Sequence, residues 1–251
     1  MNRILLVLLL VCLSPFSVSA ESLEKTVEKV KPSVVGIGIF DPTGSPRSQL
    51  RGTGFVVGDG TLVATNFHVV EHALDEDSLQ KRVVFVGTGS NPQVLDAEIL
   101  TTDPAHDLAI LKIPKKFAPL QLADNALLPD GRSVAFTGFP IGAVLGLYPA
   151  THRGIIAATT PVVIPSANAQ QLSIEMMKRL RDPFMVYQLD ATAYPGNSGS
   201  PVYDVHSGEV VAVINKVFVK ESKESVLSSP SGISYAIPII YLRKLLSDLD
   251  Q

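Results

Sequence analysis

The sequence predicts an all-β protein, and three observations support that prediction. Twelve short segments are rich in Val, Ile, Leu and Thr. Gly, Pro, Asp or Asn residues separate most of them, and short strands with turn signals between them are typical of barrels and sandwiches. The stretch 115–131 has few β-branched residues, so we expect it to link two groups of strands.

Each group contains six of the strand-like segments. The first group lies between residues 32 and 114 and comprises 33–40, 54–58, 61–67, 81–86, 95–103 and 108–113. The second group lies between residues 132 and 240 and comprises 133–139, 151–159, 184–192, 200–204, 209–219 and 234–239. No internal repeat has a fixed period, but the two halves are compatible with a pair of similar barrels.

Three stretches have a helical pattern instead. Residues 22–31 place apolar side chains at helical spacing, and Pro32 ends that helix. Residues 239–249 place five apolar side chains on one face and form a closing helix. The stretch 165–188 contains a further helical pattern with Met and Leu residues, which at this spacing usually pack. We therefore expect a surface helix there, and a regulatory loop or an oligomer contact is the alternative.

Residues 1–20 have the layout of a secretory signal. Arg3 gives a positive start, an apolar run of ten residues covers 4–13, and small residues precede a cleavage site before Glu21. A bilayer requires about 20 apolar residues, so this run is too short to span one. We expect the mature chain, 21–251, to be exported and to have no transmembrane segment.

Cys12 is the only cysteine and lies within that signal. A lipoprotein anchor on Cys12 is a competing interpretation, which the bulky Val11 before it disfavours. Without disulfides, the mature chain must be held by its core, and a domain of this length buries about 70% of its unfolded surface. Export without disulfides favours a bacterial periplasm.

The charge balance disfavours nucleic acid as a partner. The net charge is −3, and no clustered basic excess appears along the chain. A nucleic-acid surface needs such an excess to meet the phosphates. We therefore expect no nucleic-acid partner.

Three residues spread along the chain are of the types that form a catalytic triad. His68 follows one strand-like segment, Asp107 precedes another, and Ser198 lies in the stretch "YPGNSGSP". Singly, each is more typical of a structural residue than of a catalyst. Their order, His then Asp then Ser, is that of chymotrypsin-like proteases and differs from that of subtilisins and α/β-hydrolases.

The chemistry of acyl transfer gives each of these residues a role. His68 would take the proton from the Ser198 hydroxyl, which is a poor nucleophile until a base does so. Asp107 would hold the histidine tautomer and stabilise the imidazolium. Gly196 lacks a Cβ and can turn its N–H toward an oxyanion, with the N–H of Ser198 as the second donor.

Six stretches resemble motifs of HtrA/Deg-type trypsin-like serine proteases. Three surround the candidate triad: "TNFHVV", "DPAHDLAILKI" and "GNSGSP" are similar to TNxHV, DPxxDLALLKI and GNSGGP. The others are "VEKVKPSVVGI", "RGTGFVVGDGTLVATN" and "GISYAIPI". They occur in the family's order from about residue 27 to 241, nearly the whole mature chain.

The resemblance implies two six-stranded antiparallel β-barrels with short terminal helices. The N-terminal barrel would cover about 32–114, the linker about 115–131, the C-terminal barrel about 132–240, and a helix would close the chain at about 239–249. The triad would lie in the cleft between the barrels, with no cofactor and no metal. Polypeptides, unfolded or damaged, would be the substrates.

The resemblance also bears on assembly. Trimers are common in the family, so the resemblance is also compatible with a homo-oligomer. Most members carry a PDZ module after the protease domain. The sequence ends just after the closing helix, so we expect no PDZ module here.

The candidate specificity pocket departs from a trypsin-like one. Motif alignment places its base near Thr192, which is neutral, and Ile214 and Asn215 are further candidates for its lining. A preference for Lys or Arg would need an acid at that base. Ser200 and Ser234 stand where the family commonly has glycine, which would narrow nearby space. We predict small to medium apolar residues, such as Val, Ala or Leu, before the cleaved bond.

Two other functional classes compete with this interpretation. The stretch "HVVEH", from His68 to His72, satisfies the H-x-x-E-H pattern of inverted zinc proteases, with Glu175 as a third ligand. That pattern needs a helix, whereas the run before His68 is strand-like. The second class is a chaperone or peptide-binding module on a protease fold, because fold alone does not imply activity.

Overall fold

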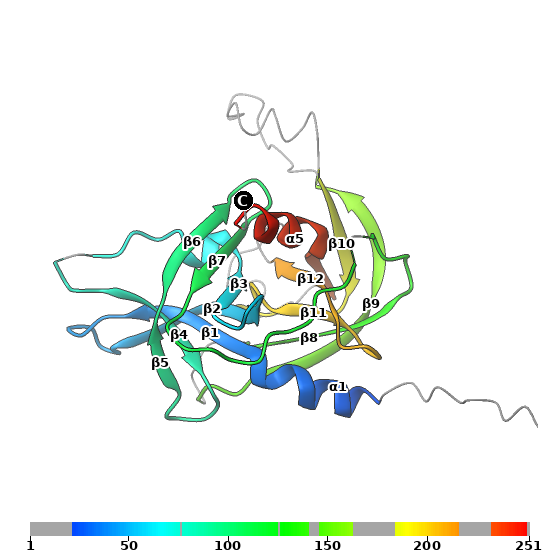
Figure 1. The fold of residues 1–251 in the computed structure, drawn as a ribbon. Coiled ribbons are helices and arrows are strands. Elements are labelled where there is room, and N and C mark those ends of the chain that lie inside the picture. The colour runs from blue at the N-terminus through cyan, green and yellow to red at the C-terminus, as the bar shows by residue number, and fades with distance from the viewer. Residues whose placement is uncertain are drawn as a thin grey trace, which may run out of the picture.

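The computed structural model describes residues 22–75, 77–124, 126–140, 146–162, 184–215 and 232–249. Two groups of antiparallel strands lie side by side (Figure 1). Helix α1 (Leu23–Val30) precedes them, and helix α5 (Ile239–Ser247) follows them. The architecture confirms the predicted all-β fold. The predicted signal sequence and the helical pattern within 165–188 lie outside the described residues, apart from the last few of that stretch.

The first group is a curled seven-stranded sheet with the order β5-β4-β1-β2-β3-β7-β6. Its strands are β1 (Val34–Phe40), β2 (Ser48–Val57), β3 (Leu62–Thr65), β4 (Lys81–Val86), β5 (Gln93–Asp96), β6 (Glu98–Asp103) and β7 (Leu108–Lys112). The stretch 95–103, expected as one strand, is divided at Ala97, whose N–H donates to the carbonyl of Arg82 at 2.9 Å. Strands β5 and β6 are the two end strands of the sheet. The chain passes directly from one to the other at Ala97, so the sheet must curl to bring its two ends together.

The second group is a closed barrel with the order β10-β13-β12-β11-β8-β9. Its strands are β8 (Ser133–Gly138), β9 (Ala150–Pro161), β10 (Met185–Asp190), β11 (Pro201–Asp204), β12 (Val210–Asn215) and β13 (Ile233–Pro238). The six strands agree with the number expected for the C-terminal barrel. Closure leaves no unpaired edge strand on this side of the molecule.

Strand β7 is a continuous apolar run because it packs against the second group of strands as well as inside the first. Leu108 and Ile110 pack in a cluster that contains residues of both groups and of α5, whereas Ala109 and Leu111 pack inside the first group. Successive side chains of a strand point to opposite faces, so β7 is buried on both faces. Apolar packing therefore fixes the two groups relative to each other.

The stretch 115–131 lies between the groups and is hydrogen-bonded to both. The N–H of Leu120 donates to the carbonyl of Val56, and the N–H of Ala123 donates to that of Val210, each at 2.9 Å. These bonds tie the connection to β2 on one side and to β12 on the other. The connection thus holds the groups together as well as joining them.

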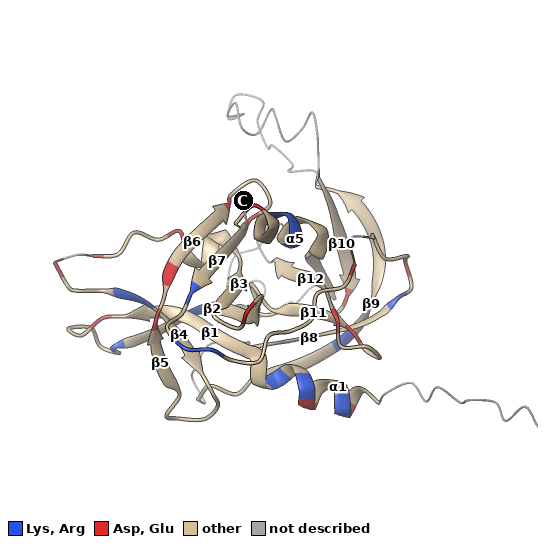
Figure 2. Cartoon of the chain, in the orientation of Figure 1, with Lys and Arg blue, Asp and Glu red and all other residues tan. Residues whose placement is uncertain are grey.

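Helix α1 packs on the second barrel although it precedes the first in sequence. The buried Thr26 hydroxyl donates to the carbonyl of Val205 at 3.0 Å. Its outer face carries interspersed Lys and Glu residues (Figure 2). Among the described residues, no helix is long and apolar enough to cross a membrane.

Candidate active site

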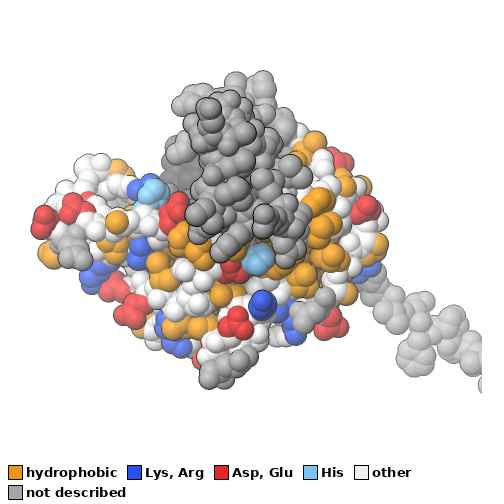
Figure 3. All heavy atoms as spheres, turned by 90° about the horizontal axis from the view of Figure 1, so that it is seen from above, with side chains coloured by type: hydrophobic (Ala, Val, Ile, Leu, Met, Phe, Trp, Pro, Cys, Tyr) orange, Lys and Arg blue, Asp and Glu red, His pale blue; other side chains and the backbone are white. Residues whose placement is uncertain are grey.

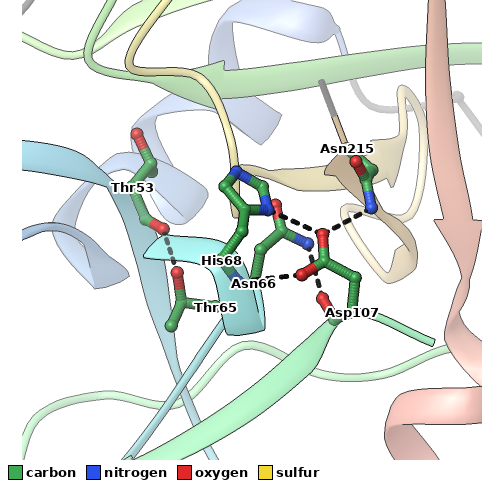
Figure 4. A network of polar contacts seen from close by, with 6 residues as sticks. All are labelled: Thr53, Thr65, Asn66, His68, Asp107 and Asn215. Atoms are coloured by element: carbon green, nitrogen blue, oxygen red, sulfur yellow. Dashed lines mark hydrogen bonds and ion pairs between the residues drawn. The ribbon is translucent and has the colours of Figure 1, made fainter. Parts of the chain in front are cut away.

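His68 lies in α2 (Phe67–Val70), one helical turn that follows β3. Its ring Nδ1 lies 2.7 Å from Oδ2 of Asp107, and its backbone N–H donates to Oδ1 of the same carboxylate at 2.9 Å (Figure 4). One contact fixes the backbone of His68 and the other fixes its ring, so both are held relative to the same carboxylate. A carboxylate accepts, so Nδ1 carries the proton in this contact and Nε2 is left as the basic nitrogen.

Asp107 is held in an unusual backbone conformation. Its φ is +54°, in the left-handed region that non-glycine residues adopt only occasionally. The carbonyl of Asp107 accepts from the N–H of Phe67 at 3.1 Å and from the side-chain amide of Asn66 at 3.0 Å. These contacts from the histidine turn stabilise the conformation that aims the carboxylate at His68.

Asn215, at the end of β12, completes the surroundings of the carboxylate. Its side-chain Nδ2 donates to Oδ2 of Asp107 at 2.7 Å (Figure 4). Asn215 is buried and was predicted for the specificity pocket, but the structure directs its amide at the acid. The carboxylate therefore receives three donors from two barrels, which fix its orientation.

The turn around Ser198 explains the glycines of the "YPGNSGSP" stretch. Gly196 and Gly199 have φ values of +97° and +85°, which side chains with a Cβ rarely adopt. A Cβ on Gly199 would also lie 2.1 Å from the carbonyl oxygen of Thr53. Both glycines are thus required for the chain to turn sharply on either side of Asn197 and Ser198.

Thr53 of β2 holds this turn from the opposite barrel. Its N–H donates to the carbonyl of Ser198 at 2.8 Å, and its hydroxyl donates to the carbonyl of Gly196 at 2.7 Å. The hydroxyl oxygen also accepts from the N–H of Phe139 at 3.0 Å. Sequence reasoning missed Thr53, although the small residues of "RGTGF" beside it indicate a close approach of two backbones.

Gly52 brings the histidine and serine segments together. A Cβ at Gly52 would lie 2.8 Å from a methyl group of Val69 and 3.0 Å from the carbonyl oxygen of Ser198. Val69, which follows His68, and Ser198 therefore both lie close to Gly52. In the described part of the chain, no hydrogen bond joins Ser198 to His68, and such bonds are often long until substrate binds.

The backbone amides expected to hold an oxyanion are those of Gly196 and Ser198. Neither N–H donates to another described residue. The backbone hydrogen bonds of the turn are donated instead by the N–H groups of Asn197, Gly199 and Ser200. Thr53 fixes the carbonyls of the same two residues. The turn therefore presents two amides while its carbonyls are occupied.

The other two residues predicted for the specificity pocket, Ile214 and Thr192, differ in burial. Ile214 is fully buried and packs in the core of the second barrel. Thr192 is half-buried in a short turn, where the Ser234 hydroxyl donates to the carbonyl of Ala191 at 2.7 Å and accepts from the N–H of Ala193 at 2.8 Å. Ser234 thus fixes the turn that carries Thr192 onto β13.

The histidine pair of the zinc interpretation does not share a helix. Helix α2 ends at Val70, before His72, and His72 is exposed. Glu175 lies outside the described residues. Within those that are described, no group of three or more His, Cys, Asp or Glu side chains is arranged to hold a metal ion.

Charges on the surface are mixed. Figure 3 shows acidic and basic side chains interspersed over the upper face among the residues it colours. At the end of β11, the buried Asp204 pairs with Arg132 at 2.7 Å. Burial alone would raise the pKa of that carboxyl, but two backbone N–H groups and the Arg132 guanidinium lower it overall. This pair fixes the β11–β12 turn to the start of β8.

Known proteins resemble this chain in sequence and in fold. The family model described as the trypsin-like peptidase domain matches residues 52–213. A probable periplasmic serine endoprotease DegP-like of Chlamydia muridarum is 31% identical over 208 residues, covering 83% of this chain and 35% of that protein. Serine protease HTRA1B of Danio rerio is 32% identical over 228 residues, covering 88% of this chain and 40% of that protein.

The structural likeness agrees with the sequence matches. An HtrA-type protease, AlgW, solved with a tripeptide, superposes with a TM-score of 0.66 at 23% identity and covers 91% of this chain and 64% of its own. The chain spans well under half the length of the two relatives compared in sequence. The matched region runs from β2 to β12 and contains His68, Asp107 and Ser198. The chain therefore belongs to the trypsin-like peptidase family, as an HtrA/Deg-like member.

Proposed function

We propose that the chain is a serine endopeptidase that cleaves polypeptides through His68, Asp107 and Ser198. One observation carries the proposal: the His68–Asp107 pair lies in connections between strands of the first sheet, and Thr53 of that sheet contacts the Ser198 turn of the second barrel. The contacts of Thr53 and Gly52 with the Ser198 turn support a site at the junction of the two groups of strands. Membership of the trypsin-like peptidase family supports the same activity.

In the proposed mechanism, Nε2 of His68 takes the proton from the Ser198 hydroxyl as its oxygen attacks the carbonyl carbon of the substrate. Asp107 stabilises the imidazolium, and Asn215 keeps the carboxylate in place. The carbonyl oxygen becomes an oxyanion that accepts from the N–H groups of Gly196 and Ser198. The C–N bond then breaks, and His68 returns the proton to the leaving amine.

Water completes the cycle. His68 takes a proton from a water molecule, which attacks the acyl-enzyme and forms a second oxyanion at the same two amides. The Ser198–acyl bond breaks, and His68 returns its proton to the serine oxygen. No cofactor takes part in this proposal.

We also propose the substrate class and the compartment. The bacterial relatives carry the name periplasmic serine endoprotease, and the signal-like residues 1–20 agree with export. Unfolded or damaged proteins in that compartment are the proposed substrates. The predicted apolar residue before the cleaved bond is a proposal that rests on the neutral Thr192.

A fluorophosphonate probe tests the proposed function. The purified mature chain should be labelled, whereas Ser198→Ala and His68→Ala should not. Folded wild-type protein without labelling would contradict a self-assembled triad and favour the peptide-binding module. Casein digestion then measures turnover, and capture of unfolded casein by Ser198→Ala measures binding without cleavage.

A further inference from the structure

The turn between β6 and β7 carries Asp107, and a second pair of histidine and aspartate side chains lies in the same turn. Asp103 ends β6 and pairs with Leu108 at the start of β7, so residues 104–107 form the turn. The Asp103 carboxylate accepts from the N–H of His106 at 3.1 Å, and its Oδ2 lies 2.6 Å from Nδ1 of the His106 ring. One carboxylate thus fixes both the backbone and the ring of the residue directly before Asp107.

Two aromatic side chains from outside the first sheet pack against the His106 ring. The ring stacks on Tyr241 of α5, with the ring centroids 4.2 Å apart, and Phe184, directly before β10, packs edge-on against it at 4.8 Å. The hydroxyl of Tyr241 accepts from the N–H of Met185 in β10 at 3.1 Å. Figure 1 shows α5 beside β6 and the β6–β7 turn. The turn is therefore held by the closing helix and by the second barrel.

The contact between His106 and Asp103 involves an ionised acceptor. Burial alone would raise the pKa of the Asp103 carboxyl, but the hydrogen bonds from the ring and backbone of His106 lower it overall. The side chains of His106 and Asp103 are only 23% and 24% exposed. Hydrogen bonds to an ionised acceptor are roughly twice as strong as neutral ones. The pair is therefore a strong constraint on the turn.

Asp107 requires such a constraint because its backbone conformation is unusual. Its φ of +54° lies in a region that a non-glycine residue keeps only where the surrounding structure holds it. Asn66 and Phe67 hold its carbonyl oxygen from the histidine turn. His106 is held by its own partners, so Asp107 is fixed through its carbonyl and through the residue that precedes it.

We infer that His106 is a positioning residue for the proposed reaction. Held by Asp103 and Tyr241, it keeps the turn in the conformation that directs Asp107 at His68. The inference rests on the proposed function. The ring of His106 packs against Tyr241 of α5, so the closing helix supports the proposed acid from outside the first sheet.

His106→Ala tests the inference. It should lower kcat on a casein-derived peptide about tenfold and leave KM nearly unchanged, because a small displacement of a catalytic group slows the chemical step. His206→Ala is the matched control and should retain wild-type kcat. The N–H of His206 also donates to an aspartate, Asp204, in the turn of a hairpin, but His206 is exposed. Wild-type kcat in His106→Ala, an increase in KM alone, or an equal loss in both variants would overturn the inference.

Conservative replacements test the two contacts of the ring separately. His106→Asn keeps a side-chain donor for Asp103 and should recover part of kcat. Tyr241→Phe keeps the stacked ring and should retain most of kcat, whereas Tyr241→Leu should lower it. Urea unfolding establishes that each variant is folded under the assay conditions. Full activity in Tyr241→Leu together with no recovery in His106→Asn would contradict the inference.

A double-mutant cycle distinguishes positioning of the acid from a general loss of stability. Asp107→Ala removes the carboxylate that His106 is inferred to direct. Adding His106→Ala to that variant should leave the rate of fluorophosphonate labelling almost unchanged, because the two residues act as one unit. Effects that multiply, as for independent sites, would mean that His106 does not act through Asp107.

A crystal structure of His106→Ala separates this inference from the proposed function. The contact between Nδ1 of His68 and the Asp107 carboxylate should be lengthened or lost. An unchanged contact would refute the inference, whatever the activity of the chain. Tyr241→Leu serves for the same measurement if His106→Ala does not fold. A wild-type chain that the probe does not label would count against the triad, and the crystal structure would still decide the role of His106.

Discussion

The side-chain amide of Asn215 and the ring of His68 contact the same oxygen, Oδ2 of Asp107, each at 2.7 Å. Asn215 comes from β12 of the second barrel, whereas His68 lies in α2 and Asp107 directly precedes β7 of the first sheet. A residue 108 positions away thus fixes the carboxylate that orients the proposed base. We expect Asn215 to act as a positioning residue, because its side-chain amide donates to the carboxylate that orients His68.

Asn215→Ala should lower kcat and leave KM nearly unchanged, since the lost hydrogen bond acts on the proposed base and not on the substrate. A hydrogen bond to a charged group contributes about 1.5–3 kcal/mol, which corresponds to a decrease of roughly tenfold to 100-fold. Steady-state kinetics on a casein-derived peptide gives both constants. Asn215→Ser, which keeps a donor, should recover part of kcat, and an increase in KM alone would contradict this role.

Thr53→Val should slow fluorophosphonate labelling and lower the free energy of unfolding. Valine has nearly the same shape but leaves the carbonyl of Gly196 and the N–H of Phe139 without the hydroxyl. Each buried group left unpaired costs about 1–3 kcal/mol. Urea unfolding and the labelling rate measure the two effects, and Thr53→Ser is the control that should restore both.

Gly138→Ala should disrupt the serine turn, because a Cβ there would lie 1.9 Å from the Ser200 hydroxyl oxygen. The Oδ1 atom of Asn197 would lie 2.9 Å away and the Thr53 hydroxyl oxygen 3.0 Å away, so the site cannot expand easily. Labelling should be lost or strongly reduced. The double variant Gly138→Ala, Ser200→Gly should recover part of it, and no recovery would mean that Ser200 is not the main obstacle.

His152 should make the fold less stable as the pH falls. Burial lowers its pKa below the usual value, so the folded chain favours the neutral ring, which stacks on Phe136 at 4.8 Å. Below pH of about 6.5 the unfolded chain binds a proton that the folded chain resists. The free energy of unfolding should therefore decrease as the pH falls from about 6.5 through the lowered folded-state pKa.

Urea titrations at pH 7.5, 6.0 and 5.0 measure this dependence. His152→Phe, which keeps a ring against Phe136 without a titrating group, should show a smaller decrease over the same interval. His206, which lies in the exposed β11–β12 turn and for which no such burial applies, provides the control substitution, His206→Gln. An identical decrease in wild type and His152→Phe would assign the effect to other groups.

The all-β class could be predicted because β-branched residues, glycines and prolines act locally. The runs at β1, β7 and β12 have that local signature, and each forms a strand. The division at Ala97 could not be predicted, because it depends on a hydrogen bond to Arg82 in another strand. Bends of this kind arise from sheet closure and leave no compositional signal.

The candidate site, like the fold, was predictable from the sequence only in part. His68, Asp107 and Ser198 could be selected from residue type and order, and the structure brings His68 and Asp107 into contact. Thr53 acts on Gly196, 143 positions away, so only the docking of two barrels reveals it. Asn215 and Ile214 are neighbours on one strand, and its twofold period sends one side chain to Asp107 and the other into the core.

The clamp that Thr53 places on the Ser198 turn has a consequence for the timing of activity. A chain in which only one of the two groups of strands has folded lacks either the Thr53 contacts or the Ser198 turn that they hold. Such an intermediate has no complete proposed site and cannot cleave itself or its neighbours. On the proposed mechanism, proteolysis would begin only after the two groups of strands have docked, so activity would report complete tertiary folding.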